Sequence, residues 1–350
     1  MINGKKNVYN LELSELEGIF ATWKEPLYRP RQVMSWLYQQ RVSSWREMTN
    51  LPLSLRERLD QSLSIESPVI VNKKVSSIDG TSRYQLQLSD GNYVECVFLP
   101  QERWNTVCLS TQVGCPLKCR FCATGKGGFI RNLTAGEIVE QVMKIEEDNC
   151  ARVDHAVLMG MGEPLLNYDE TVKAIRLMNS RWSMNIGMRH LTLSTVGVVP
   201  GIRDLSKFKW QINLAISLHA ATNELRNQLV PINRQYPLEM LFAACREYIK
   251  QTGRRITFEY VMISGINDSP AEAQRLARRL KNLRPCHVNL LPLNPVESVD
   301  FMPSSLETIK KFGEILLKAG IPTTIRKERG RDISAACGQL RIPLFKSLRK

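Results

Sequence analysis

The sequence predicts an α/β protein, with a partial TIM-like (βα)6 barrel that follows a small helical domain and a β-hairpin. Two observations lead to this fold class. From Thr106 onward, apolar strand-like runs alternate with helical segments, which is the pattern of a parallel sheet covered by helices. Six such strand–helix steps occur within about 220 residues, and this number suits a partial or full βα barrel.

Composition indicates a folded chain with cysteine chemistry. The chain has 350 residues, of which 43% are hydrophobic and 23% charged, so one large domain or two ordinary ones are expected. It has neither an apolar leader nor a run of about 18 apolar residues, so we expect a cytosolic protein without a membrane span. Nine cysteines without a secretory signal favour metal or redox chemistry over a disulfide framework.

The charge balance favours a polyanionic partner. The chain carries 48 Lys and Arg residues against 34 Asp and Glu, a net charge of +14, which suits nucleic acid better than a neutral metabolite. A basic enzyme that never binds nucleic acid would show the same balance. The best candidates for phosphate contacts are the basic segment from Arg326 to Lys350 and Arg275, Arg278 and Arg279 at helical spacing.

The first 100 residues are predicted to hold the two accessory regions. Residues 1–66 form a helical domain whose small core contains Trp36, Tyr38 and Trp45. Residues 67–100 form a β-hairpin extension between two helical regions, with a turn at Asp90-Gly91. The expected helices are Leu11–Thr22, Arg31–Gln40 and Leu53–Leu63, and the expected strands are Val69–Val75, Tyr84–Leu88 and Tyr93–Leu99.

Residues 101–330 are predicted to form the barrel, and residues 331–350 a C-terminal tail. The capping box Thr134-x-x-Glu137 begins the clearest helix, Ala135–Glu147. The expected strands are Val107–Thr111, Ala156–Met159, Leu191–Ser194, Ile212–Ser217, Ile256–Met262 and Val288–Leu291, with a possible further strand at Thr323–Arg326. In such barrels function collects in the loops after the strands, and the unusual polar residues of this chain fall in those loops.

The strongest motif follows the first of these strands. Cys115, Cys119 and Cys122 place three thiols in one tight loop, and the Lys and Arg between them are expected to favour the thiolate form. The alternatives are buried free thiols or a zinc site, but structural zinc normally takes four ligands and no second cysteine pair is present. Three ligands suit an iron–sulfur cubane with one open iron. The CxxxCxxC spacing closely resembles the signature of the radical S-adenosylmethionine (SAM) superfamily.

Polar residues end the next strands. Gly160-Met161-Gly162-Glu163-Pro164 follows the second strand, where glycines let a ligand approach the backbone and Glu163 offers a carboxylate to a cation. Taken alone, each residue could have a purely structural role, in a solvated turn or in a satisfied hydrogen bond near the core. Their shared position at one rim favours cosubstrate binding. The further members are Ser194, Ser217, Leu218, His219 and Asn294.

Three more residues are candidates for chemistry. Cys108 lies on the first strand of the barrel, seven residues before the first cluster cysteine, and Cys337 lies in the C-terminal segment. For both, a buried or incidental thiol is the alternative. Glu95 shares a strand face with Tyr93 and Val97, so it is either poised for proton transfer or at a solvated strand edge.

From about Arg29 to Leu340 the chain resembles the bacterial radical SAM methyltransferases that place a methyl group on C2 of adenine in 23S ribosomal RNA and in transfer RNA. The segments that carry this resemblance are Tyr28-Arg-Pro-Arg-Gln32, Val94-Glu95, Gln112-Val-Gly-Cys115, Arg131-Asn-Leu-Thr134, Gly160 to Asn167, Ser217-Leu-His219, Val230-Pro-Ile-Asn233 and Ala335-Ala-Cys-Gly-Gln339.

The resemblance implies a role for each site residue. Cys115, Cys119 and Cys122 would hold a [4Fe–4S] cluster. Cys337 would be methylated by one SAM, and Cys108 would later form a disulfide with it. Glu95 would be the general base. The expected SAM contacts are Gly162, Glu163, Ser194, Ser217, Leu218, His219 and Asn294.

The resemblance also implies the reaction and its partners. A second SAM yields a 5′-deoxyadenosyl radical, which takes hydrogen from methylated Cys337, and the resulting carbon radical adds to C2 of an unstacked adenine. The partners would be 23S rRNA, tRNA, an electron donor such as flavodoxin or ferredoxin, and a thiol reductant, and we expect a monomer. Two alternatives stay open at this point: the sibling enzyme that methylates C8 of adenine, and an RNA-binding redox sensor with a purely structural cluster.

Overall fold

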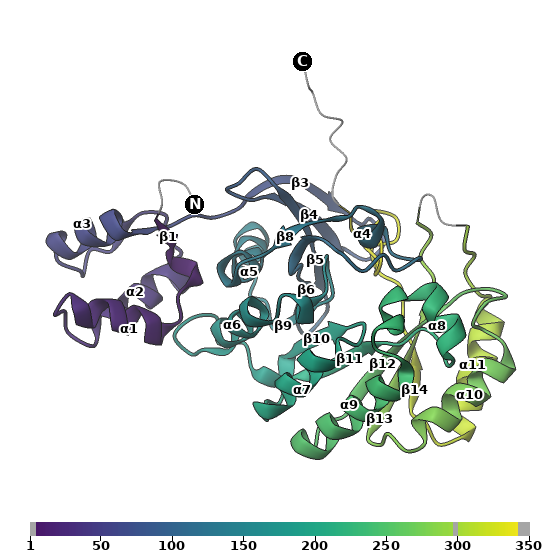
Figure 1. Cartoon of the computed structure of the whole chain (residues 1–350). Helices are drawn as coiled ribbons and strands as arrows, with labels where there is room; N and C mark the ends of the chain where they lie inside the picture. Colours follow the sequence, from purple (N-terminus) through teal and green to yellow (C-terminus); the bar gives the residue numbers. More distant parts are fainter. Residues whose placement is uncertain (1–4, 297–299, 342–350) are drawn as a thin grey trace.

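The computed structural model describes residues 5–296 and 300–341. Parallel strands with helices on the outside form a barrel-like sheet (Figure 1). These strands are β6 (Asn105–Cys108), β9 (His155–Leu158), β10 (Leu191–Thr195), β11 (Asn213–Ser217), β12 (Ile256–Met262), β13 (Cys286–Pro292) and β14 (Thr323–Ile325). Within the described residues β14 pairs only with β13, so the barrel stays open. The predicted partial barrel is confirmed, including its possible last strand.

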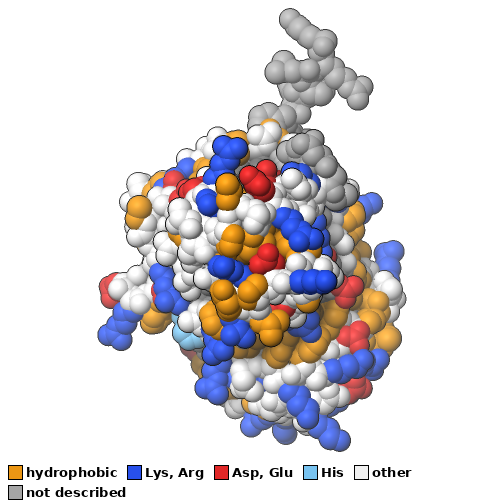
Figure 2. Space-filling model, turned by 90° about the vertical axis from the view of Figure 1, so that its left-hand side faces the viewer, with side chains coloured by type: hydrophobic (Ala, Val, Ile, Leu, Met, Phe, Trp, Pro, Cys, Tyr) orange, Lys and Arg blue, Asp and Glu red, His pale blue; other side chains and the backbone are white. Residues whose placement is uncertain are grey.

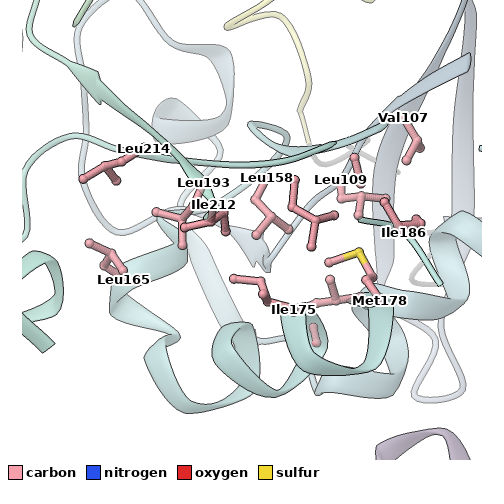
Figure 3. Packing of buried hydrophobic residues seen from close by; sticks show 14 of the residues in the cluster. Val107, Leu109, Leu158, Leu165, Ile175, Met178, Ile186, Leu193, Ile212 and Leu214 are labelled. Atoms are coloured by element: carbon pink, nitrogen blue, oxygen red, sulfur yellow. The ribbon is translucent and has the colours of Figure 1, made fainter. Parts of the chain in front are cut away.

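Six helices connect consecutive parallel strands. They are α5 (Ala135–Asn149), α6 (Tyr168–Asn179), α7 (Val199–Lys207), α9 (Leu238–Thr252), α10 (Pro270–Leu280) and α11 (Leu306–Lys318). The predicted capping box begins α5, because the Thr134 hydroxyl accepts from the Glu137 amide at 3.3 Å and the Glu137 carboxylate accepts from the Thr134 amide at 2.9 Å. Figure 3 shows Leu158 and Leu193 of the sheet facing Ile175 of α6, and all three are buried.

The strands of the predicted hairpin extension join the barrel sheet. β3 (Val69–Val75), β4 (Ser82–Gln87) and β5 (Tyr93–Pro100) form an antiparallel meander, and β5 pairs antiparallel with β6. The result is one sheet of ten strands, in the order β14-β13-β12-β11-β10-β9-β6-β5-β4-β3. This pairing places Val97 opposite Cys108, so the face of β5 that carries Glu95 lies beside the first strand of the barrel.

The N-terminal region contains the three expected helices, α1 (Leu13–Thr22), α2 (Arg29–Tyr38) and α3 (Leu53–Ser62). Helix α2 begins two residues earlier than expected, because Pro30 lies within its first turn, where proline is tolerated. Tyr38 and Trp45 are buried as predicted, while Trp36 is partly buried. Asn10 accepts a hydrogen bond from the Gly136 amide at 2.8 Å, which ties this region to the start of α5.

Several short elements were not predicted. β7 (Gln112–Gly114) and β8 (Phe129–Asn132) form a two-stranded ribbon around the cysteine loop. The others are β1 (Lys6–Asn7), β2 (Leu63–Ser64), α4 (Ala123–Lys126), α8 (Asn223–Leu229), η2 (Val8–Asn10), η3 (Trp45–Glu47), η4 (Pro164–Leu166), η5 (Met188–His190) and η6 (Pro231–Arg234). Residues 1–4 of the predicted N-terminal domain and 342–350 of the predicted tail lie outside the described residues. No helix in the described part has the length and apolar character of a membrane span.

Candidate active site

A cavity of about 250 Å³ lies at the carboxyl ends of the barrel strands. This is the rim that the sequence predicts for function. The cavity wall brings together eleven of the thirteen predicted site residues, and the two exceptions are Glu95 and Leu218. The predicted residues that line it are Cys108, Cys115, Cys119, Cys122, Gly162, Glu163, Ser194, Ser217, His219, Asn294 and Cys337.

The cysteine loop is fixed by backbone hydrogen bonds. The Cys115 amide donates to the Gly128 carbonyl at 2.7 Å, and the Arg120 amide donates to the Leu229 carbonyl at 3.0 Å. Burial raises the pKa of the Cys115 thiol to about 12. The neighbouring Lys118 and Arg120 side chains are exposed to solvent, where their charge is screened, so the expectation that they favour the thiolate stays a prediction.

The three thiols suit a cluster better than a single ion. Among the described residues, no group of three or more His, Cys, Asp or Glu side chains converges closely enough to hold one metal ion. Cys115, Cys119 and Cys122 nevertheless share one cavity wall. A [4Fe–4S] cluster held by these three thiols would keep one iron open to another ligand.

The turn after β9 presents a close backbone surface to the cavity. Gly162 has φ +102°, and a Cβ atom there would lie 2.6 Å from the Gln112 Cβ, so only glycine fits. The Glu163 carboxylate accepts hydrogen bonds from the Leu165 amide at 3.0 Å and the Val196 amide at 2.9 Å. Burial raises the pKa of Glu163 to about 7, and these hydrogen bonds partly oppose the shift.

The ends of β10 and β11 are held by buried polar groups. His219 has φ +60°, and its Nδ1 accepts from the Val261 amide at 3.1 Å. Burial, assisted by the nearby charge of Arg226, lowers the pKa of His219 to about 3, so its imidazole is neutral. Leu218 is fully buried, and its carbonyl accepts from Arg226 Nε at 3.0 Å. Leu218 therefore lies behind the cavity wall, where its carbonyl holds Arg226.

Cys108 and Cys337 line the same cavity although they are 229 positions apart in the chain. The Asn294 amide group donates to the Cys337 carbonyl at 3.2 Å, and the Ala123 amide donates to the Gly338 carbonyl at 2.8 Å. Burial raises the pKa of Cys108 to about 12. These contacts connect the C-terminal segment to the rim at β13 and to the cysteine loop.

Sequence reasoning did not assign three charged residues to this site, although it counted one of them, Arg326, among the candidates for phosphate contacts. Arg326 and Glu259 both line the cavity, and the proximity of Cys337 raises the pKa of Arg326 above its usual range. Arg326 directly follows β14 at the rim, and Glu259 interrupts the apolar strand β12. Both positions are of the kind that drew attention to the other site residues. Arg226 is fully buried and donates to carbonyls at the ends of β10 and β11. Nothing in the sequence distinguished it from a surface arginine.

Glu95 is buried, with 2% of its surface exposed, so the alternative of a solvated strand edge is wrong, but it does not line the cavity. Its Oε1 accepts from Arg83 Nε at 3.1 Å. Its Oε2 accepts from the Arg341 amide at 2.9 Å. In this arrangement the carboxylate contacts the C-terminal segment and not the cavity.

Comparison with known proteins agrees with this geometry. Residues 109–280 match the Radical SAM superfamily model, and residues 6–65 match the model described as "Ribosomal RNA large subunit methyltransferase N-terminal domain". A relative from Clostridium novyi, named "Probable dual-specificity RNA methyltransferase RlmN", is 45% identical over 96% of this chain and 98% of its own length. A relative of the same name from Pelotomaculum thermopropionicum is 47% identical over 97% of this chain and 93% of its own.

The chain belongs to the dual-specificity RNA methyltransferases of the radical SAM superfamily. The crystal structure of a radical SAM methyltransferase from Sphaerobacter thermophilus covers 96% of this chain and 99% of its own, with a TM-score of 0.90 and 46% identity. This membership makes the chain an RNA-modifying enzyme that uses a [4Fe–4S] cluster and SAM. The redox-sensor alternative is therefore wrong.

Proposed function

We propose that this methyltransferase modifies C2 of adenine in 23S rRNA and in tRNA by way of a methylated Cys337. The observation that carries the proposal is that Cys337 and Cys108 line one cavity with the three cysteines of the cluster loop. A methyl carrier has to lie beside the radical source, and a resolving thiol has to be within reach of the carrier.

The residues present fit both the cluster and SAM. Three thiols form the donor set at one wall, and the cradle at Gly162 has no room for a side chain. Asn294 Oδ1 is buried without a hydrogen-bond partner among the described residues, so it has an acceptor free for a ligand. When bound, the cluster supplies one electron that cleaves SAM to methionine and a 5′-deoxyadenosyl radical.

The chain's own residues would perform the remaining steps. Cys337 accepts a methyl group from the first SAM and later loses a hydrogen atom from that group to the radical. The carbon radical adds to C2. The adduct then loses its C2 proton, with Glu95 as the base, and one electron, for which the cluster left oxidised by SAM cleavage would be the acceptor. Cys108 attacks the Cys337 sulfur and breaks its bond to the methylene carbon, which takes up a proton to give methylated adenine. The disulfide that remains is reduced by an external thiol.

Basic side chains support contact with the RNA backbone. Figure 2 shows Lys and Arg side chains spread over the face that carries the N-terminal helices, and exposed residues there include Lys24, Arg31 and Arg58. Phosphate contacts of this kind fix the RNA without reading its sequence. Of the other basic candidates, Arg275 is paired with Glu272 and Arg279 with Glu239, so their charge is partly neutralised.

The same proposal includes two redox partners and an oligomeric state. The partners are an electron donor of flavodoxin or ferredoxin type and a thiol reductant, and the protein is a monomer.

One experiment tests the chemistry and its position. Anaerobically reconstituted protein is incubated with 23S rRNA or tRNA, reductant and SAM, and the methyl group is located by mass spectrometry of digested nucleosides. We expect methyl at C2 of adenine in both RNAs. We also expect Cys337→Ala to abolish transfer while iron content and the cluster absorption spectrum stay at wild-type levels. Methyl found at C8 would overturn the assignment, and activity retained in Cys337→Ala would overturn the carrier.

A further inference from the structure

The segment that carries Cys337 is held on both sides by one buried ion pair. Arg83 and Glu95 form a salt bridge in which 16% and 3% of the respective side chains are exposed. Arg83 Nη1 donates to the carbonyls of Ile333 and Ser334, each at 3.3 Å. Glu95 Oε2 accepts from the Arg341 amide at 2.9 Å. The anchor points therefore lie three and four residues before Cys337 and four residues after it.

Between these anchors the segment forms a tight turn with Cys337 at its tip. The Gln339 amide donates to the Ala336 carbonyl at 3.1 Å, and Cys337 itself is exposed. The segment contains no helix or strand from Arg326 to Arg341. The place of the thiol is therefore set by individual contacts, among them the bond from the Ala123 amide to the Gly338 carbonyl, instead of by a regular backbone ladder.

We infer that Arg83 and Glu95 together form a latch that fixes the Cys337 segment across the cavity, so that Arg83 is a positioning residue for methylation of Cys337. The inference rests on the proposed function, because it takes Cys337 as the methyl acceptor. In that transfer the thiol loses its proton to solvent and the sulfur forms a bond to the methyl carbon. The sulfonium of SAM takes the bonding pair and leaves as S-adenosylhomocysteine. Displacement needs the sulfur in line with the methyl group, and a misplacement of about 1 Å costs on the order of 100-fold in rate.

The latch gives Glu95 a task that is separate from its proposed role as base. Methylation of Cys337 removes no proton from adenine, and the thiol proton goes to solvent, so the proposed base for adenine has no part in that step. If Glu95 acts only as a base, the first transfer should be insensitive to Glu95→Gln. If it also holds the segment, the loss of its charge weakens the pair with Arg83 and slows the first transfer as well.

The test measures two properties of the full-length, cluster-loaded protein. The first is hydrogen–deuterium exchange of the peptide that spans residues 330–341, followed by mass spectrometry. The second is the rate at which methyl-deuterated SAM labels Cys337 without reductant or RNA. Arg83→Met removes the latch, and Arg83→Lys retains the charge beside Glu95. Lys73→Met is the matched control, because Lys73 pairs with Asp148 on the opposite face of the same strands, where Tyr84 also contacts Asp148.

We expect Arg83→Met to speed exchange of the segment about 10-fold or more, since the anchoring hydrogen bonds are lost, and to slow labelling of Cys337 about 10- to 100-fold. Lys73→Met should stay within about 3-fold of wild type in both measurements. Arg83→Lys keeps the charge beside Glu95 but not the forked hydrogen bonds of the guanidinium, so it should lie between wild type and Arg83→Met. Glu95→Gln should slow labelling by about 3- to 10-fold, and it keeps the test open if Arg83→Met does not fold.

Two results would overturn the latch. One is wild-type exchange of the segment in Arg83→Met, and the other is unchanged labelling in both Arg83→Met and Glu95→Gln. Absence of labelling in the wild-type protein would instead refute Cys337 as methyl acceptor. The exchange measurement alone would then decide whether the pair holds the segment.

Discussion

Replacement of Gly162 by alanine tests the geometry of the SAM site most directly. Gly162 has φ +102°, a conformation that residues with a side chain rarely adopt. An added Cβ would also lie 2.6 Å from the Gln112 Cβ and 2.9 Å from the Gln112 backbone nitrogen. Because one of these atoms belongs to the backbone, the overlap cannot be relieved by rotation of a flexible side chain.

The structure separates the two costs of this substitution. The backbone strain alone costs about 1 to 3 kcal/mol, and the overlap adds about 1 to 3 kcal/mol because the neighbouring chain has to shift. Gly91 provides the matched control, since it has φ +82° but a Cβ added there would meet no atom within 4 Å. Gly91→Ala should therefore show the strain without the overlap.

The displaced residue also connects this overlap to binding. Gln112 Oε1 accepts from the Glu163 amide at 2.9 Å, so a shift of Gln112 moves the turn that carries the carboxylate. We expect Gly162→Ala to weaken SAM binding about 10-fold or more, a loss of about 1.4 kcal/mol, and Gly91→Ala to leave it unchanged. Equilibrium dialysis with labelled SAM measures the binding.

Thermal unfolding of the two variants measures the stability difference. At about 1 to 2 °C per kcal/mol for a chain of this length, Gly162→Ala should unfold about 1 to 6 °C below Gly91→Ala. Equal unfolding temperatures together with equal SAM affinity would refute the argument that the Gln112 contact decides this position.

Three further predictions concern the chemistry and the partner. Cys108→Ala should trap a covalent protein–RNA adduct that survives a denaturing gel, whereas the buried Cys96→Ala should not, and free protein and RNA after turnover of Cys108→Ala would exclude the resolving role. Burial raises the pKa of Glu163 from 4.5 to about 7. The folded protein therefore keeps this proton up to about pH 7, whereas the unfolded chain releases it near pH 4.5. Stability should therefore fall by about 3 kcal/mol as pH rises from about 4.5 to 7, and thermal scans of Glu163→Gln should lack this slope. RNA affinity should fall steeply between about 50 and 200 mM salt in filter binding, and an increase with salt would contradict phosphate-dominated contact.

Sequence periodicity predicted most of the framework, because the barrel is built from local alternation of strands and helices. Val69–Val75 and Ile256–Met262 were predicted with the bounds that the structure has. The rule that function collects after parallel strands also placed the cavity correctly. The β7–β8 ribbon was missed because its strands are three and four residues long, which is too short for an alternating pattern to register.

The buried charged residues show what local sequence patterns cannot predict. A carboxylate on an apolar strand face drew attention to Glu95, and the same signal was present at Glu259 without being recognised. In neither case could the residue that pairs with the carboxylate be predicted from the sequence of the strand. Arg83 lies on the neighbouring strand, and Arg341 is 246 positions away from Glu95. Such partners depend on which strands are neighbours in the sheet and on where the C-terminal segment packs. The sequence of a single strand contains neither piece of information.

The same reasoning explains why sequence motifs reveal the reacting residues more readily than the residues that position them. Thiols and glycine turns have few structural substitutes, so their spacing is visible in the sequence. The contacts that hold Cys337 come from Arg83 and Glu95 on the antiparallel strands, Ala123 beside the cluster loop and Asn294 after β13. These elements meet only after the ten-stranded sheet has formed. The proposed methyl carrier therefore gains its position from the completed fold, and substitutions that leave every reacting atom in place can still disable it.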